Sequence, residues 1–319
     1  MGQPVITERG RIVLRRKFGE AEMSDARGIT RARLLARFVN DLASKRFGGV
    51  VFGYEGVLRN VGGGGAGGPI GADAQHTMPL KEIGSELERL LRNGITVGIV
   101  SSAGRESVEP ELQHTIRPEY WASTHVGYCN GGDIRTLDDD DDDGNGPAHH
   151  QEGADENLES FLQSTVSDRI IPEDRVVRSG HPHQASIKNH DGMYGAVQII
   201  RSAERAYASM PDGIKVLESS AGRLTDVLTN HTSKADLARR VGGMVPKDRH
   251  MLCIGCDGQW PGSDCELLTH RYSLSTNTVS ATAASCWNLL PSGEYGEEGA
   301  LTYLKSMNAK DGLLSVTMA

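Results

Sequence analysis

The sequence predicts an α/β protein built on a parallel β-sheet. Two short apolar stretches, at residues 50–52 and 94–100, have the composition of buried strands. An amphipathic helical stretch separates them, and the order of strand, helix and strand is typical of a parallel sheet with helical crossovers. With 319 residues the chain exceeds the usual size of one domain, so we expect one large domain or two linked domains.

The N-terminal part of the chain predicts an arm followed by a helix. Residues 1–28 show no clear hydrophobic periodicity, and we expect them to form the arm. Beyond them, apolar residues recur at helical spacing and predict one buried stripe on a helix that leads into the first strand. Core packing is enough to explain this stripe, which consists of Leu34, Leu35, Phe38, Val39 and Leu42.

A glycine run and a second amphipathic helix follow the first strand. Residues 62–68 are almost all glycine, but they lack the Gly-Lys-Ser/Thr ending of a phosphate-binding loop and no helix follows at once, so we expect an ordinary loop. Pro79 suits the first turn of a helix, and Asn93-Gly94 suits its end. The predicted buried face of this helix consists of Leu80, Ile83, Leu87, Leu90 and Leu91.

Residues 50–58, with the sequence VVFGYEGVL, resemble the first active-site loop of the haloacid dehalogenase-like (HAD) superfamily. In that superfamily a hydrophobic strand runs into a Phe-Asp-Tyr-Asp-Gly-Thr-Leu type loop, whose first aspartate attacks phosphorus and whose second is the general acid/base. Gly53 and Glu55 stand at these two positions here. Glycine has no side chain with which to attack phosphorus or to bind a metal.

Three further segments resemble the remaining motifs of the superfamily, in the same order. Ser101 follows the second strand at the position of a phosphate-binding hydroxyl, with Ser102 as the alternative. Lys234 stands at the position of the phosphate-neutralising lysine at a helix start. Residues 251–264 resemble the fourth motif, in which Asp257 and Asp264 are the candidate metal ligands.

The resemblance implies a Rossmann-like parallel-sheet core with an inserted α+β cap domain of the C2 type. We expect the core at residues 29–107 and 226–319 and the cap at residues 108–225, with an acidic loop at residues 138–157. Such a cap covers the active site and selects the substrate.

Within the predicted cap, Asn130-Gly131 is a hairpin signal, and residues 196–200 and 214–217 are candidate strands. The run Asp138–Asp143 lacks the ligand spacing and closing glutamate of a calcium-binding EF-hand, so we expect a solvated loop.

Magnesium binding is expected to be weakened or absent. In the superfamily the nucleophile and the fourth-motif aspartate both bind Mg²⁺, whereas here Gly53 and Gly255-Cys256 stand at those places. Mg²⁺ takes oxygen ligands, and a cysteine sulfur would be a poor substitute. A zinc site at Cys253, Cys256, Cys265 and His270 is the less favoured interpretation, because Cys253 lies within an apolar strand and buried thiols explain the pattern. The histidines at positions 149, 150, 181 and 183 are interpreted as loop residues.

These departures suggest two functions. The first is a non-catalytic binding or regulatory subunit that recognises a phosphorylated ligand or a protein partner through Ser101, Lys234 and the backbone of residues 53–56. The alternative is a slow Mg²⁺-dependent phosphomonoester hydrolase in which Glu55 activates water for direct attack. Glu55 is one methylene longer than the aspartate of the family, and a misplacement of about 1 Å costs roughly a hundredfold in rate.

Composition limits the remaining possibilities. A net charge of −8 argues against a nucleic-acid surface as the main function, despite local basic runs at residues 11–17 and 31–37. Five cysteines, an odd number, favour a reducing compartment, and we expect a cytoplasmic protein. No apolar stretch approaches the roughly 20 residues of a membrane span. A homo- or hetero-oligomer is compatible with the sequence.

Overall fold

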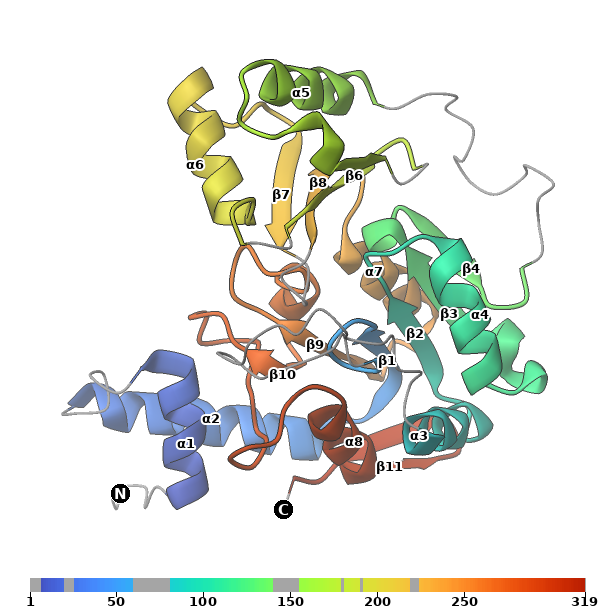
Figure 1. Ribbon diagram of the computed structural model, residues 1–319. Helices are drawn as coiled ribbons and strands as arrows, with labels where there is room; N and C mark the ends of the chain where they lie inside the picture. The colour runs from blue at the N-terminus through green and yellow to red at the C-terminus, as the bar shows by residue number, and fades with distance from the viewer. Residues whose placement is uncertain are drawn as a thin grey trace.

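The computed structural model describes residues 7–19, 26–59, 81–139, 155–178, 181–189, 192–218 and 224–318. These residues form two sheets with their covering helices. The larger sheet is mostly parallel, and the smaller one, above it in Figure 1, is antiparallel. The predicted α/β core with a separate α+β cap is therefore confirmed.

The larger sheet has the strand order β10-β9-β1-β2-β3-β4, and β1 is central. Its strands from β10 to β3 are parallel, whereas β4 pairs with β3 in the antiparallel sense. A terminal hairpin of β11 and β12 joins it through β12 and β1. The strand bounds are β1 Phe47–Gly53, β2 Thr96–Val100, β3 Thr124–Tyr128, β4 Asp133–Thr136, β9 His250–Asp257, β10 Ser273–Thr278, β11 Met307–Lys310 and β12 Leu313–Val316.

Helices cover both faces of this sheet, which is why its central strands read as continuous apolar runs. Every residue of β1 is buried. On one face, Val50 and Phe52 join the main core with α3 (Lys81–Arg92) and α8 (Gly296–Ser306). On the other face, Val51 packs with α7 (Lys234–Met244).

Close packing on the α7 face depends on a glycine in β2. A Cβ at Gly98 would lie 3.0 Å from Val241 Cγ2 and 3.0 Å from Val51 Cγ2, so α7 approaches the sheet where a side chain is missing. The predicted strands at residues 50–52 and 94–100 and the predicted helix between them are confirmed, with Gly94 ending the helix at positive φ. Pro79 and the glycine run at residues 62–68 lie outside the described residues.

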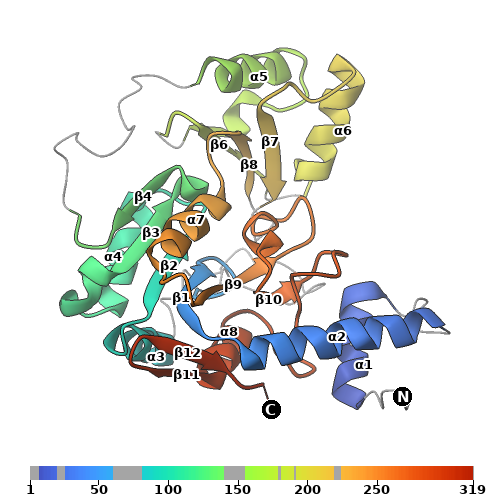
Figure 2. The ribbon, with the colours of Figure 1, turned by 180° about the vertical axis from the view of Figure 1, so that it is seen from behind.

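The N-terminal segment, expected to be an arm or a short preliminary element, contains a helix. Two helices, α1 (Glu8–Phe18) and α2 (Ala26–Ser44), cross and contact each other at the bottom of Figures 1 and 2, and the expected boundary at residue 28 falls inside α2. The stripe predicted on α2 is confirmed, with Phe38 and Leu42 buried. Cationic side chains of α1 hold it against the chain at residues 285–291, an arrangement that periodicity alone does not predict.

Lys17 is the most buried of these cations. Its Nζ donates to the carbonyl oxygens of Ser285 at 2.6 Å and Cys286 at 2.7 Å and lies 5.1 Å from the centre of the Trp287 ring. Burial lowers the pKa of Lys17 to about 8. Arg16 donates to the carbonyl oxygens of Leu290 and Pro291, at 2.6 and 2.8 Å. The arm is therefore part of the folded core.

The cap is the antiparallel sheet β5-β6-β8-β7, and its own small core lies between the sheet and two helices. The bounds are β5 Val176–Arg178, β6 Gln184–Lys188, β7 Ile214–Glu218, β8 Leu224–Thr229, α5 Glu156–Ser167 and α6 Ala196–Tyr207. In both ribbon views α5 lies at the end of the cap away from the core, and α6 runs beside β7 (Figures 1 and 2).

Three details of the expected cap are wrong. The stretch at residues 196–200 forms the start of α6 rather than a strand, because its buried residues Ala196, Ile199, Ile200 and Ala203 repeat at helical spacing. The Asn130-Gly131 segment joins β3 to β4, and both strands belong to the larger sheet. The cap therefore does not begin at residue 108, and β8 carries it past residue 225. Asp140–Asp143 and most of the expected acidic loop lie outside the described residues.

Candidate active site

The candidate site lies where the carboxyl ends of the central parallel strands meet, as expected for an open α/β sheet. β1 ends at Gly53 and leads to Glu55, and β2 ends just before Ser101. Lys234 is the first residue of α7, after the Ser233 side chain caps the helix by accepting from Ala235 N–H. Asp264 follows β9. The structure thus brings together Gly53, Glu55, Ser101, Lys234 and Asp264, the five positions singled out in the sequence apart from Asp257.

Asp264 lies directly against Gly53. A Cβ at Gly53 would lie 2.7 Å from Asp264 Oδ2, which is closer than any real Cβ contact. The Asp264 side chain is completely buried, and its Oδ2 accepts a 2.7 Å hydrogen bond from the backbone N–H of Cys256. The carboxylate therefore occupies the space in which a nucleophilic side chain at position 53 would begin.

Lys234 is ion-paired inside the protein. Its Nζ donates to Asp264 Oδ1 at 2.8 Å and lies 3.8 Å from Glu55 Oε2, and only 1% of the Lys234 side chain is exposed. Burial by itself lowers the pKa of Lys234, but the Asp264 and Glu55 carboxylates outweigh it and raise that pKa. The lysine is consequently a fixed cation with two anionic partners, and it does not act as a base.

The Glu55 carboxylate accepts hydrogen bonds from the two residues that follow β2. Ser101 Oγ donates a short hydrogen bond to Glu55 Oε1, and the backbone N–H of Ser102 donates to Glu55 Oε2 at 3.2 Å. Ser101 is the residue whose hydroxyl enters the site, whereas Ser102 contributes only its backbone. The side-chain carboxylate of Glu55 thus sits on donors that, by the resemblance, would hold a phosphoryl group.

The loop after β1 also uses its own backbone donors. The N–H of Tyr54 donates to Val100 O at 2.8 Å, and the N–H of Gly56 donates to Arg59 O at 2.8 Å. Gly56 has a φ of 70°, which a glycine adopts without strain. These two N–H groups are therefore satisfied within the fold and are not directed at a ligand.

Asp257 stands apart from the contact between Gly53 and Asp264. Its Oδ1 accepts from Asn277 Nδ2 at 3.2 Å and from Thr278 Oγ1 at 3.4 Å. Burial, followed by the nearby charge of Asp264, raises the pKa of Asp257 to about 6. The neighbouring Cys256 thiol is buried, which raises its pKa far above the ordinary value, so no thiolate is expected there.

The side chains around Gly53 offer few uncommitted oxygen ligands to a magnesium ion. Position 53 offers no ligand, and each Asp264 oxygen already accepts a hydrogen bond, one from Lys234 and one from Cys256 N–H. Both Glu55 oxygens are similarly engaged. Across the described ranges, no group of three or more His, Cys, Asp or Glu side chains is arranged to hold a metal ion, at this site or around Cys253 and His270.

The sequence interpretation missed a group of residues that joins the cap to the core beside the site. Asn130, in the turn after β3 with a φ of 56°, donates from Nδ2 to Asp226 Oδ2 at 3.2 Å and to Gln184 Oε1 at 3.1 Å. Gln184 Nε2 donates to Ser102 O at 2.8 Å, and Ser186 Oγ donates to Asp226 Oδ1 at 2.7 Å. The cap strands β6 and β8 are thereby tied to the core.

Asp226 is the most unusual member of this group. It is fully buried, and desolvation raises its pKa to about 6 even though Ser186 and Asn130 donate to it. A carboxylate inside the apolar stretch of β8 was the available signal, since buried carboxylates need partners. Its partner Asn130 is 96 residues away, so the sequence did not reveal the pair.

Comparisons with known proteins agree with this architecture. No family model matches the sequence, and no curated protein matches it. Among solved structures, a Plasmodium vivax protein provisionally described as a HAD/COF-like hydrolase is 11% identical, with a TM-score of 0.58, over 84% of this chain and 97% of that one.

Two further structures show weaker likeness. Trehalose-6-phosphate phosphatase of Aspergillus fumigatus is 17% identical over 86% of this chain and 97% of that one, with a TM-score of 0.45. A haloacid dehalogenase-like hydrolase from Bacillus subtilis is 11% identical over 72% and 89%, with a TM-score of 0.47. Within the described part of the chain, no helix is long and apolar enough to cross a membrane. From its sheet topology, its cap and the Plasmodium structure, this chain has the fold of the haloacid dehalogenase-like superfamily.

Proposed function

We propose that this chain does not catalyse phosphoryl transfer and that it uses the HAD-like fold as a binding or regulatory protein. The observation that carries the proposal is the contact between Asp264 and Gly53. Covalent catalysis needs a carboxylate that is free to attack phosphorus. Here the carboxylate that lies nearest to a Cβ at position 53, among the described residues, belongs to Asp264, and it is buried in an ion pair with Lys234.

Ser101 Oγ and Ser102 N–H already donate to Glu55. We therefore favour binding of a partner by another surface over binding of a phosphoryl group at this site. A phosphate would have to displace Glu55 from Ser101 and Ser102 and would bring further negative charge beside Asp264. Like charges in a poorly solvated site repel strongly. A phosphorylated ligand is therefore the less favoured of the two expected ligand classes.

Contacts across the junction of cap and core also support a binding role. On one side, Asn130 binds Asp226 and Gln184. On the other side, Lys215 Nζ of β7 donates to Glu266 Oε1 at 2.6 Å, and the N–H of Glu218 donates to Pro261 O at 2.8 Å. A cap that admits substrate has to open and close, whereas these contacts on both sides favour a fixed two-domain scaffold.

The alternative hydrolase would use Glu55 as a base that activates water. Both oxygens of Glu55 already accept hydrogen bonds from Ser101 and Ser102, which leaves the carboxylate poorly placed to take a proton from water. We therefore assign Glu55 a structural role and use it to separate the two functions experimentally.

The test is Mg²⁺-dependent phosphate release from sugar phosphates, nucleotides and an aryl phosphate. It compares the native chain with Glu55→Gln and with a matched control, Glu88→Gln, whose carboxylate pairs with Arg117 at a distance of 2.9 Å on the surface. We expect the same background rate from all three proteins. Turnover by the native chain and the control that disappears in Glu55→Gln would overturn the proposal and establish the hydrolase.

A further inference from the structure

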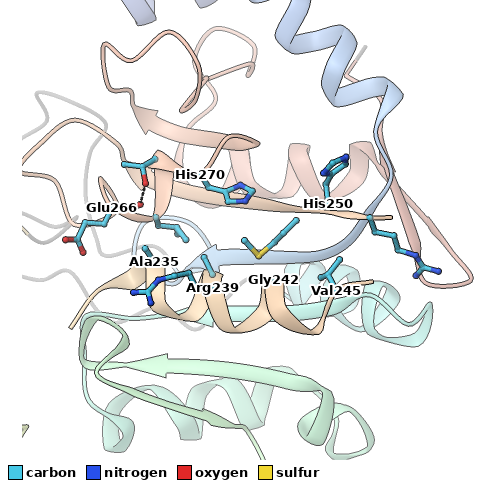
Figure 3. A pocket seen from close by; sticks show the side chains of 12 residues that line it. Ala235, Arg239, Gly242, Val245, His250, Glu266 and His270 are labelled. Atoms are coloured by element: carbon cyan, nitrogen blue, oxygen red, sulfur yellow. Dashed lines mark hydrogen bonds between the residues drawn. The ribbon is translucent and has the colours of Figure 1, made fainter. Parts of the chain in front are cut away.

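A second candidate ligand site lies on the α7 face of the larger sheet. A pocket of about 440 Å³ opens between α7, β9 and the short helix η5 (Leu267–Thr269), as Figure 3 shows. This volume is within the usual range for small-molecule sites, roughly 300–1,000 Å³. None of the residues of the Gly53 and Asp264 contact lines it.

Two features of the surrounding chain leave this pocket open. The connection from β9 to β10, residues 258–272, contains only the three-residue helix η5, so no full helix packs beside α7 there. The wall formed by α7 is also open at Gly242, which has no side chain. A Cβ at Gly242 would lie 3.8 Å from Met251 Sδ, and a longer side chain would extend into the pocket.

The adjacent Gly243 differs from Gly242 in its surroundings. A Cβ at Gly243 would meet nothing within 4 Å. Both glycines lie in the last turn of α7. Only at Gly242 does the missing side chain leave space next to the pocket.

The lining combines apolar side chains with hydrogen-bond donors. Ala238, Val245, Met251 and Leu267 provide apolar surface. Arg239 and Arg249 are the cationic groups of the lining, and Arg249 already donates from Nη1 to Gly312 O. His270 Nδ1 faces the backbone of Tyr272, at 3.2 Å from its carbonyl oxygen and 3.3 Å from its nitrogen.

One acidic side chain, Glu266, also lines the pocket, but its charge is balanced. Its Oε1 accepts from Lys215 Nζ at 2.6 Å, and its Oε2 accepts from Ser233 Oγ at 2.7 Å. The remaining charged lining groups, Arg239 and Arg249, are cationic. Arg239 pairs with Asp236 on the exposed surface of α7, where such pairs contribute little and leave the guanidinium able to bind an anion.

We infer that this pocket binds a small amphiphilic anion, with a carboxylate or phosphate head toward Arg239 and an apolar body against Met251, Val245 and Leu267. The apolar wall supplies most of the contact area, and the charged head fixes the orientation of the ligand. This inference is independent of the loss of catalysis proposed for the Gly53 site, because the two sites share no residue.

Binding is measured first with 8-anilinonaphthalene-1-sulfonate, an anionic aromatic dye, by fluorescence titration of the full chain. We expect saturable binding of one dye that Gly242→Leu weakens at least tenfold by filling the pocket. Gly243→Leu is the matched control, since it makes the same change on the same helix turn outside the pocket. No saturable binding by the native chain, or equal loss in both variants, would overturn the inference.

The chemistry of the ligand is tested by displacement of the dye with octanoate, octyl phosphate and octylamine. We expect the two anions to displace the dye and octylamine to be at least tenfold weaker. The ratio of octanoate to octyl phosphate then distinguishes a carboxylate from a phosphate head. Arg239→Gln should weaken both anions severalfold, whereas the neighbouring Arg240→Gln should not. Equal displacement by octylamine would contradict an anion site.

Discussion

The Asp264 carboxylate and Gly53 are mutually dependent, because the first fills the volume that any side chain at the second would need. The separation of 2.7 Å between Asp264 Oδ2 and a Cβ at position 53 is too short for both groups to keep their places. The buried ion pair between Asp264 and Lys234 therefore requires a glycine at position 53.

Gly53→Ala is expected to destabilise the protein by about 1–3 kcal/mol, the usual cost of overpacking a core. Gly53→Asp should lose at least as much and should not gain phosphatase activity by itself, since its carboxylate would compete with Asp264 for one space. Urea denaturation and phosphate release measure the two effects. Gly243→Ala, in open space on α7, should instead stabilise the protein slightly. Rapid Mg²⁺-dependent turnover by Gly53→Asp would show that Asp264 moves aside readily.

Removing one partner of the buried ion pair should be far more costly than removing a surface pair. We expect Lys234→Met and Asp264→Asn each to cost about 3–5 kcal/mol, because the remaining charge is left buried, and the double variant to cost less than the sum. The exposed pair of Arg178 and Glu159 is the control, with an expected coupling of about 0–1 kcal/mol. Equal coupling energies in the two cycles would contradict a structural role for Lys234 and Asp264.

Removing the Glu55 carboxylate should create an anion site. In Glu55→Ala, Ser101 Oγ and Ser102 N–H lose their acceptor beside Lys234, and inorganic phosphate or sulfate is expected to replace it. The variant should gain thermal stability as phosphate is added, whereas the native chain should not. Adding Ser101→Ala should reduce the effect. A phosphate-dependent rise in Tm that is equally large in the native chain would mean that Glu55 does not block the site.

Asp226 should make folding stability depend on pH. Because burial raises its folded pKa from 3.8 to about 6, the folded state holds this proton more tightly than the unfolded state. The stabilisation is fully present below about pH 4 and is lost as the pH rises through about 6. A shift of this size corresponds to about 3 kcal/mol.

Asp226→Asn removes this titration and keeps a similar shape. The difference in unfolding free energy between the native chain and Asp226→Asn should therefore favour the native chain increasingly as the pH falls from 7 to 4. Urea denaturation at several pH values measures this difference, in which the titration of other groups cancels. A difference that does not change with pH would contradict the raised pKa of Asp226.

The sequence by itself determined the local elements and the residues at the ends of the strands. Apolar runs specified β1, β2 and β9, and helical spacing specified α2 and α3, because each pattern lies within a short segment of chain. The glycine at the nucleophile position and the place of Lys234 at a helix start came from the resemblance of local segments to the superfamily motifs. The helix α1 was missed, since its buried residues are few, and the start of α6 was taken for a strand although its buried residues repeat at helical spacing.

Only the tertiary structure decided how these side chains pair. Asp264 and Gly53 are 211 positions apart in the printed sequence, and Asn130 and Asp226 are 96 apart. No local pattern encodes which carboxylate meets which lysine, amide or glycine across such separations. Each of these pairings matters for stability, because a buried charge that has lost its contact with water needs a partner inside the fold. The sequence therefore shows a glycine where the resemblance expects a nucleophile, and the packing of distant segments places the Asp264 carboxylate beside it.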